Sequence, residues 1–169
     1  MMYNWQQQIP PHFAKESRVW IYQAARRFTM PEALHIESLL DDFVANWHSH
    51  GSPVKGFATL LFGQFVVIMA DETATGVSGC STDSSVRVIR EIEAHTGVPM
   101  FSRTTLAFWV NNKVELIPMN QAAYALQHGI IGADTLYFNN LVATKEALLH
   151  QWLIPVKQSW LISKLPQLA

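Results

Sequence analysis

Residues 76–85 combine glycines, hydroxyl groups and the single cysteine of the chain in one short segment. The segment follows an apolar run and precedes residues with helical spacing, so it is expected to form the loop at a helix N-terminus. Free N–H groups and about half a positive charge at such a terminus favour a bound anion. We therefore expect a small anionic ligand or a partner to bind at this loop. The expected binding residues within it are Ser78, Gly79, Ser81, Thr82, Asp83 and Ser84.

Cys80 lies in the middle of this segment, where the same field would favour its thiolate form, the form that attacks as a nucleophile. A thiol-dependent enzyme also needs a base, and His48 and His50 are candidates. Two structural readings compete with this one. Cysteine is among the most buried residue types, and a histidine at the end of a helix is stabilised by the helix dipole. A third possibility is a structural or scaffold subunit with no ligand.

Asp71 and Arg103 are further candidates for ligand binding. Asp71 ends an apolar run expected to be a strand, a position from which its carboxylate can contact a ligand or cap the following turn. Arg103 stands in a polar segment and can hold a carboxylate or phosphate through two parallel hydrogen bonds. Asn139 and Asn140 interrupt another apolar run, and buried amides of this kind either anchor the backbone or face a pocket.

Metal and cofactor motifs are missing from the sequence. His48 and His50 are two residues apart, but no third ligand stands at a diagnostic spacing. Phosphate-binding loops of the G-x-x-x-x-G-K-[ST] kind, dinucleotide-binding G-x-G-x-x-G and H-E-x-x-H are all absent. We therefore expect neither a metal nor a cofactor.

The composition excludes several classes of protein. The 169 residues are 49% hydrophobic, and 12 Lys and Arg oppose 13 Asp and Glu for a formal net charge of -1. Nucleic-acid binding is not expected because it requires a basic surplus. The most apolar stretch, 57–70, is shorter than the ~20 residues of a membrane-spanning helix. The single cysteine and the lack of a secretory signal favour the cytoplasm.

Charged residues make up only 15% of the chain, against about 25% in typical soluble domains. This shortage predicts a homo-oligomer. We place its interface on the N-terminal arm, 1–13, and on two C-terminal helices expected over 144–165.

Periodicity predicts a single α+β domain over 1–169. A strand is expected at 19–24, followed by a helix that begins at the capping box Thr29 to Glu32. Two strands around Gly63-Gln64 are expected to form a hairpin with a type II′ turn, and 65–69 lacks alternation, as in a strand covered on both faces. A helix over 83–96 and a second hairpin around 111–113 follow.

The second half is expected to hold a short helix capped by Asn120, a strand over 135–142 and two helices separated by Pro155. The resulting sheet is predicted to be mixed and mostly antiparallel with helices packed on it. The first half has the β-α-β-β-α-β order of ferredoxin-like folds.

The segments 18–23, 43–51, 78–86 and 138–140 together resemble a family of small bacterial proteins of uncharacterised function. Some proteins similar to these carry the label of ABC transporter ATPases. The residues here do not support that label because the phosphate-binding loop is absent. The resemblance implies no mechanism, but it marks 78–86 as the most distinctive segment.

Overall fold

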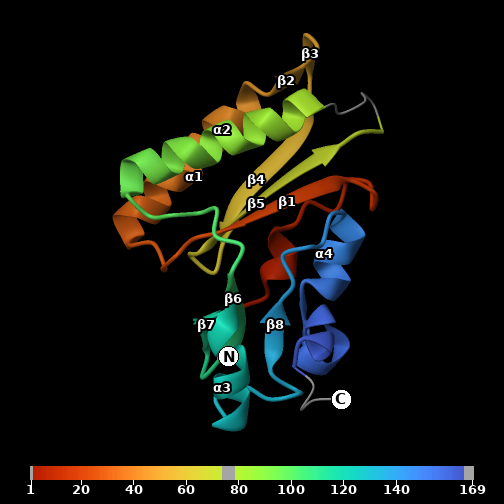
Figure 1. Cartoon of the computed structure of the whole chain (residues 1–169). Coiled ribbons are helices and arrows are strands. Elements are labelled where there is room, and N and C mark those ends of the chain that lie inside the picture. The colour runs from red at the N-terminus through yellow and green to blue at the C-terminus, as the bar shows by residue number, and fades with distance from the viewer. Residues whose placement is uncertain (1, 74–78, 166–169) are drawn as a thin grey trace.

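The computed structural model describes residues 2–73 and 79–165, and for residues 79–82 only the backbone belongs to this description. Its strands form a three-stranded sheet in the order β1-β5-β4, a four-stranded sheet in the order β7-β6-β8-β9 and a short β2-β3 ribbon. Figure 1 shows the first sheet beneath α1 and α2, with the second sheet and α3 on the opposite side. Every strand pairing in the described part of the chain is antiparallel.

The strands are β1 (Arg18–Gln23), β2 (His48–Ser49), β3 (Ser52–Pro53), β4 (Lys55–Leu61), β5 (Phe65–Asp71), β6 (Thr105–Val110), β7 (Lys113–Pro118), β8 (Leu136–Phe138) and β9 (Leu153–Pro155). The α-helices are α1 (Met30–Ala45), α2 (Gly79–Thr96), α3 (Ala122–Gln127) and α4 (Lys145–Gln151). Short 3₁₀ helices are η1 (Trp5–Gln8), η2 (Met119–Gln121), η3 (Val156–Gln158) and η4 (Trp160–Ser163).

Strand β5 is the centre of the fold because both of its faces are buried. All seven residues are buried, with Val66, Ile68 and Ala70 in one apolar cluster. The alternate residues Phe65, Val67 and Met69 belong to a second cluster on the opposite face. The lack of alternation in the sequence thus predicted the two-sided burial correctly.

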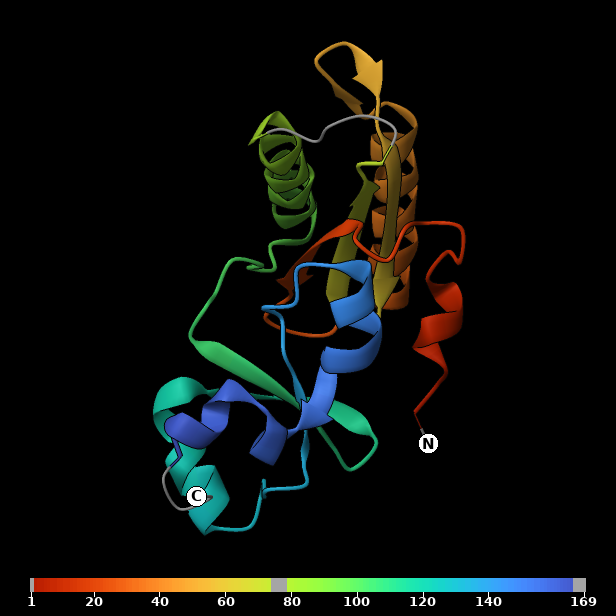
Figure 2. The same ribbon diagram turned by 90° about the vertical axis from the view of Figure 1, so that its right-hand side faces the viewer.

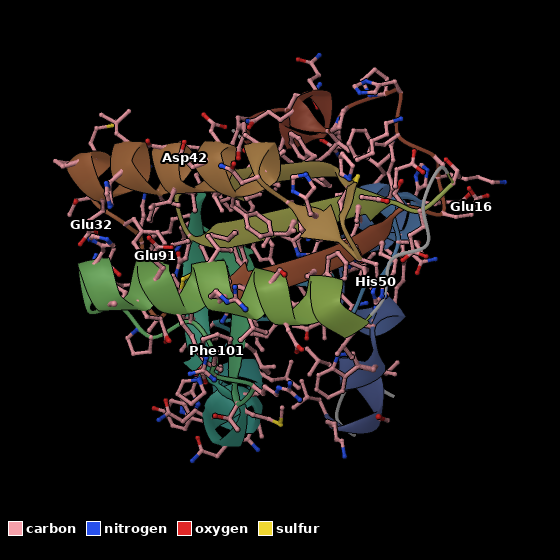
Figure 3. All side chains as sticks on the ribbon, turned by 90° about the horizontal axis from the view of Figure 1, so that it is seen from above. Glu16, Glu32, Asp42, His50, Glu91 and Phe101 are labelled. Atoms are coloured by element: carbon pink, nitrogen blue, oxygen red, sulfur yellow. The ribbon has the colours of Figure 1, made fainter. Side chains whose placement is uncertain are left out.

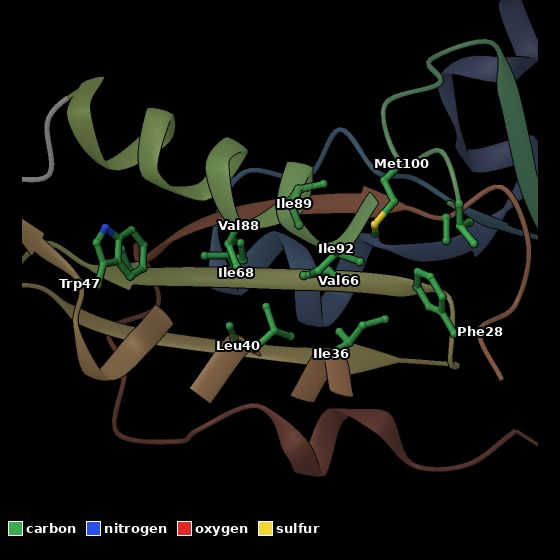
Figure 4. Packing of buried hydrophobic residues seen from close by; sticks show 14 of the residues in the cluster. Phe28, Ile36, Leu40, Trp47, Val66, Ile68, Val88, Ile89, Ile92 and Met100 are labelled. Carbon is green, nitrogen blue, oxygen red and sulfur yellow. The ribbon is translucent and has the colours of Figure 1, made fainter. Parts of the chain in front are cut away.

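Helices α1 and α2 cover the first face of this sheet. Figure 4 shows Ile36 and Leu40 of α1 and Ile89 and Ile92 of α2 packed against the strands. The capping box that starts α1 is present as predicted: Thr29 accepts the N–H of Glu32, whose carboxylate accepts the N–H of Thr29.

The N-terminal arm and α4 cover the second face (Figure 2). Trp5 of the arm is buried against Trp152, with ring centroids 4.9 Å apart and nearly perpendicular planes. Ile9 and Phe13 are buried in the same cluster. The apolar residues that suggested an oligomer interface at the arm are therefore covered by the chain itself.

Both predicted hairpins are present, but the first turn differs from the prediction. Phe62 and Gly63 both have positive φ, 56° and 63°, which is the pattern of a type I′ turn one residue earlier than the expected type II′ turn. The twist of such turns suits paired strands. The ring of Phe62 packs against Trp152 and Phe138, which compensates for its left-handed backbone. In the second hairpin, Asn111 and Asn112 have positive φ as their side chains allow.

The first half of the chain follows only three strands of the ferredoxin-like order. Strands β1 and β4 run in the same direction, and β5 lies between them in the antiparallel sense. The fourth strand of that order, β6, joins the second sheet between β7 and β8. Among the described strands, none therefore neighbours the outer edge of β1 along most of its length.

The C-terminal region differs from the predicted pair of helices over 144–165. α4 ends at Gln151, and Leu153–Pro155 forms the edge strand β9, paired with β8. Proline is compatible with an edge strand because its missing N–H removes no interior hydrogen bond. The remainder forms only the 3₁₀ turns η3 and η4. The strand predicted over 135–142 is likewise shorter, since it turns after Phe138.

Lys145 fastens the N-terminal arm to the body of the protein. Its side chain is 8% exposed, and Nζ donates to the carbonyl oxygens of Pro10, Pro11 and Phe13 at 2.8, 3.3 and 2.8 Å. Hydrogen bonds from a charged donor are stronger than those between neutral groups. Lys145 therefore holds the arm over the second face of the sheet.

Replacing Lys145 by methionine should release the arm while keeping most of the side-chain volume. We expect the free energy of unfolding to fall by about 1.5–3 kcal/mol, the range for hydrogen bonds to charged groups, and thermolysin to cut within the arm faster. Urea unfolding and the rate of cleavage measure the two effects. Lys15→Met is the control because Lys15 makes only an exposed 3.9 Å ion pair with Glu16. Equal effects of the two variants would contradict the role of Lys145.

Candidate functional site

The segment singled out in the sequence is helical over most of its length. α2 begins at Gly79, four residues before the expected start, so Ser81, Thr82, Asp83 and Ser84 belong to the helix and not to a loop before it. No glycine or proline interrupts 80–96, so nothing opposes this earlier start. Ser78 and the side chains of 79–82, with that of Cys80, lie outside the described residues.

Among the described side chains of this segment, Asp83 is exposed and Ser84 is half-buried. The next residue, Ser85, is fully buried, and its Oγ lies 2.9 Å from the phenolic oxygen of Tyr22 on β1. This contact joins α2 to the edge of the sheet. It gives one of the hydroxyl residues a structural role.

The two candidate bases lie on the β2-β3 ribbon, which contacts α2. Figure 3 shows His50 beside the beginning of that helix. Both imidazoles are exposed, and Nδ1 of His48 lies 3.0 Å from the carbonyl oxygen of Asn46. The fold thus brings the ribbon beside α2, the helix to which Cys80 belongs.

Asp71 is 2% exposed, and both oxygens of its carboxylate are occupied. Oδ2 accepts from the N–H of Ala14 at 3.0 Å and from Nζ of Lys55 at 3.3 Å. Oδ1 accepts from the N–H and the hydroxyl of Thr73 at 3.0 and 2.7 Å, which forms the turn considered as the structural alternative. The N–H groups of Ala14 and Thr73, the Thr73 hydroxyl and Lys55 hold the pKa of Asp71 well below its usual range. This carboxylate organises the end of β5.

Arg103 is exposed and lines a groove of about 740 Å³ between α2, the edge of β1 and the second sheet. Arg18 at the start of β1 and Arg90 on α2 line the same groove. We call it the arginine groove. Its lining contains these three arginines and no aspartate or glutamate.

Aromatic rings form much of the wall of the arginine groove. The guanidinium of Arg90 lies 5.3 Å from the centre of the Phe101 ring, and Phe101 meets Tyr22 edge to face at 5.8 Å. At the other end, Arg18 lies 4.9 Å from the centre of the Trp20 ring and 3.5 Å from Glu72. In the described part of the chain, Arg90 and Arg103 have no carboxylate partner.

A chain of amide hydrogen bonds forms the base of the groove and joins the two sheets. Nε2 of Gln23 donates to the carbonyl oxygen of Thr105 at 3.1 Å, and its Oε1 accepts from Nδ2 of Asn140 at 2.9 Å. Oδ1 of Asn140 accepts from Nε1 of Trp152, also at 2.9 Å. Asn140 thus anchors neighbouring groups and lines the groove, so both alternatives considered for it apply.

The arginine groove offers positive charge, aromatic surface and amide groups, and these suit an anion. No group of three or more His, Cys, Asp or Glu side chains within 2–73 and 83–165 is placed to hold a metal ion. Among the helices described, none is long and apolar enough to cross a membrane.

Comparison with protein-family models, curated proteins and solved structures finds no match for this chain.

Sequence reasoning found Arg103 but missed Arg18 and Arg90 as its neighbours. The three residues come from a strand, a helix and a connecting segment that are distant in the sequence. Arg90 lies on the amphipathic helix α2, and Arg18 is the first residue of β1. Nothing in the residues next to either arginine indicates a binding site. Only the placement of α2 beside the edge of β1 brings them together.

Replacing Asp71 by asparagine tests its structural role. The amide nitrogen of asparagine cannot accept hydrogen bonds, so we expect a loss of about 1–3 kcal/mol in the free energy of unfolding at neutral pH. Because the pKa of the folded carboxyl is lowered, its stabilisation is present above the unfolded pKa of about 4 and is lost as the pH falls toward the folded pKa. The difference in the free energy of unfolding between the wild type and Asp71→Asn should therefore become smaller below pH ~4.

Urea unfolding of both proteins at pH 7 and at pH 3 measures this difference. Asp42→Asn serves as the control because Asp42 is exposed on α1, and surface changes of this kind stay within about 0.5 kcal/mol. A difference that is constant between the two pH values would contradict the interpretation.

Proposed function

We propose that this protein binds an anionic ligand, and that the arginine groove is the binding site. The observation that carries the proposal is the meeting of Arg18, Arg90 and Arg103 in a groove whose lining has no carboxylate. The whole chain has a formal net charge of -1, so this local excess of positive charge is not a consequence of composition. Of the segment 76–85 first expected to bind the ligand, 79–85 belong to the proposal only as part of α2 beside the groove, and 76–78 lie outside the described residues.

The arrangement of the arginines supports a ligand that reaches into the groove. Arg90 lies on α2, and Arg103 lies in the segment between α2 and β6. Arg18 lies at the start of β1 and forms an ion pair with Glu72. A planar guanidinium binds carboxylate or phosphate through two parallel hydrogen bonds. Arg90 and Arg103 are therefore the proposed anion contacts, and Arg18 contributes mainly to the local potential.

The walls of the groove indicate that the ligand also has an apolar part. Tyr22, Phe101 and Trp160 line it together with aliphatic residues. Its volume of about 740 Å³ lies within the usual range for ligand sites, about 300–1,000 Å³. A bare inorganic ion would leave most of this space to water.

Inorganic phosphate and glutarate are suitable first probes, with binding measured by isothermal titration calorimetry. We expect Arg103→Ala and Arg90→Ala each to weaken glutarate binding by about tenfold or more, since a charged hydrogen bond contributes about 1.5–3 kcal/mol and 1.4 kcal/mol is tenfold. Raising the salt concentration should weaken binding to the wild type.

Arg87→Ala is the matched control, because Arg87 is exposed on the same helix but does not line the groove. An equal loss with Arg87→Ala would show nonspecific charge effects only. The absence of any binding by phosphate or glutarate to the wild type would contradict the proposal at once.

A second candidate function is a thiol-dependent reaction at Cys80 with His48 or His50 as the base. The contact between the β2-β3 ribbon and α2 favours it. Alkylation of Cys80 by iodoacetamide across pH 5–10 tests it, and we expect a midpoint well below the free-thiol value of about 8.5. His48→Ala and His50→Ala should move that midpoint upward. A slow reaction with a midpoint at or above ~8.5 would reject the enzyme.

A homo-oligomer in the cytoplasm stays a prediction from the composition. The burial of Trp5, Ile9 and Trp152 within the chain reduces the apolar surface that placed an interface on the arm and the C-terminal region, whereas Tyr3 on the arm is 41% exposed. Large exposed apolar side chains remain elsewhere, among them Leu34 on α1 and Leu141 in the lining of the groove. A structural subunit without a ligand predicts no effect of the arginine substitutions on binding, so the calorimetry above also separates it from the ligand-binding proposal.

A further inference from the structure

The hydrogen bonds at the start of β1 show which of its backbone N–H and C=O groups point toward the arginine groove. The N–H of Val19 donates to the carbonyl oxygen of Ala143 at 3.0 Å, and the N–H of Lys145 donates to that of Ser17 at 2.9 Å. Both bonds point away from β5. In an antiparallel pair, successive residues direct their N–H and C=O groups alternately to one side and the other, so every second residue of β1 presents these groups to the outer edge.

Ile21 is the next residue in this series, and its peptide N–H and C=O face the groove. Within the described residues they have no partner. At the far end of the edge, the N–H of Ala25 donates to the carbonyl oxygen of Pro99 at 2.9 Å. The open interval between Val19 and Ala25 is six residues, or roughly 20 Å at about 3.3 Å per residue. It is the place that a fourth strand would occupy if β6 continued the first sheet.

We propose that the arginine groove binds an acidic, extended segment of a partner polypeptide, which pairs with the outer edge of β1 as an added strand. This inference rests on the proposed function and names the class of the anionic ligand. The backbone of the segment exchanges hydrogen bonds with Ile21, and Arg90 and Arg103 hold its carboxylates. Addition of a strand to an exposed edge is a general mode of peptide recognition.

The chain already uses this edge in the same manner at one end. Residues 143–145 form an antiparallel bridge with β1 at Arg18↔Thr144. An added segment would continue that pairing along the strand toward Gln23. The groove lining follows the whole of this interval, since it includes 18–23 on one side and 140–143 on the other.

Charge complementarity selects an acidic segment. The lining has three arginines and no carboxylate, and within the described residues only Arg18 is paired with a carboxylate, that of Glu72. Glutamate or aspartate side chains therefore meet a net positive charge at Arg90 and Arg103. A basic segment would be repelled by the same residues. Side chains of an added strand alternate in direction. Carboxylates on the α2 side meet Arg90, and the residues between them meet the apolar side chains of Ile21 and Val142 on the opposite side.

The closed ends of the edge limit the length of the segment. Residues 143–145 occupy one end, and the bond from Ala25 to Pro99 occupies the other. The positions opposite 20–24 lie between them, so at most about five residues in extended conformation fit there at ~3.3 Å per residue. A short peptide is therefore a sufficient probe.

The probe is an acetylated and amidated four-residue peptide of alternating valine and glutamate. We expect it to bind at least tenfold more tightly than glutarate, which supplies carboxylates but no peptide backbone. Two further peptides carry N-methyl groups on alternate amides, one on the valines and the other on the glutamates. Only one set of amides faces β1 in an added strand, so one methylated peptide should lose at least tenfold in affinity and the other should bind nearly as well as the parent.

Amide hydrogen exchange measured by NMR gives a second readout in the protein itself. Binding should slow exchange of the Ile21 N–H, whereas the N–H of Trp20, which faces Ile68 of β5, should change little. Arg103→Glu should abolish binding of the acidic peptide. A peptide with lysine in place of each glutamate should bind tightly neither to the wild type nor to Arg103→Glu.

The outcomes separate the two proposals. If glutarate binds as tightly as the peptide, or if both methylated peptides bind equally well, strand addition is overturned and the anionic site stands. If glutarate, phosphate and the peptide all fail to bind, both proposals fall. If the peptide binds without protecting Ile21, the segment lies elsewhere and the inference is wrong.

Discussion

The burial of β5 on both faces is the constraint on which the rest of the structure depends. Its alternate side chains enter two separate apolar clusters, so each face requires its own cover. α1 and α2 supply one cover, whereas the arm, α4 and Trp152 supply the other. A strand with seven buried residues can be stable only when distant parts of the chain close over it. The hydrogen bonds that Lys145 donates to the arm hold it against the second face of the sheet.

The arginine groove follows from the same arrangement. With β5 between β1 and β4, the next strand along the chain could extend the sheet only at β1, yet β6 joins a second sheet. The edge of β1 is thereby left between α2 and residues 140–143. Gln23 donates a hydrogen bond to Thr105 and accepts one from Asn140, and these two bonds join the two sheets. The groove is thus a product of topology, and its charge comes from residues that the topology assembles.

Local signals in the sequence predicted local structure well. The capping box of α1, both hairpins and the two-sided burial of β5 each depend on residues within a short window. The predictions failed where competing elements decide the outcome. Leu153–Pro155 became a strand because β8 offers an edge to pair with, and α2 starts before its serines and threonine. The site was the least predictable part, since only Arg103 had a local signal, and the meeting with Arg18 and Arg90 needs the assembled fold.

An unpaired strand edge usually exposes a protein to uncontrolled association, because one molecule can add to another without limit. Here the edge of β1 ends at residues 143–145 on one side and at Pro99 on the other. An identical strand from a second copy could therefore pair with β1 only over this short interval. The positive charge of the walls repels an identical surface as well. The closed ends and the positive charge therefore disfavour the long pairing between identical edges from which fibres grow, and a short acidic segment can still bind.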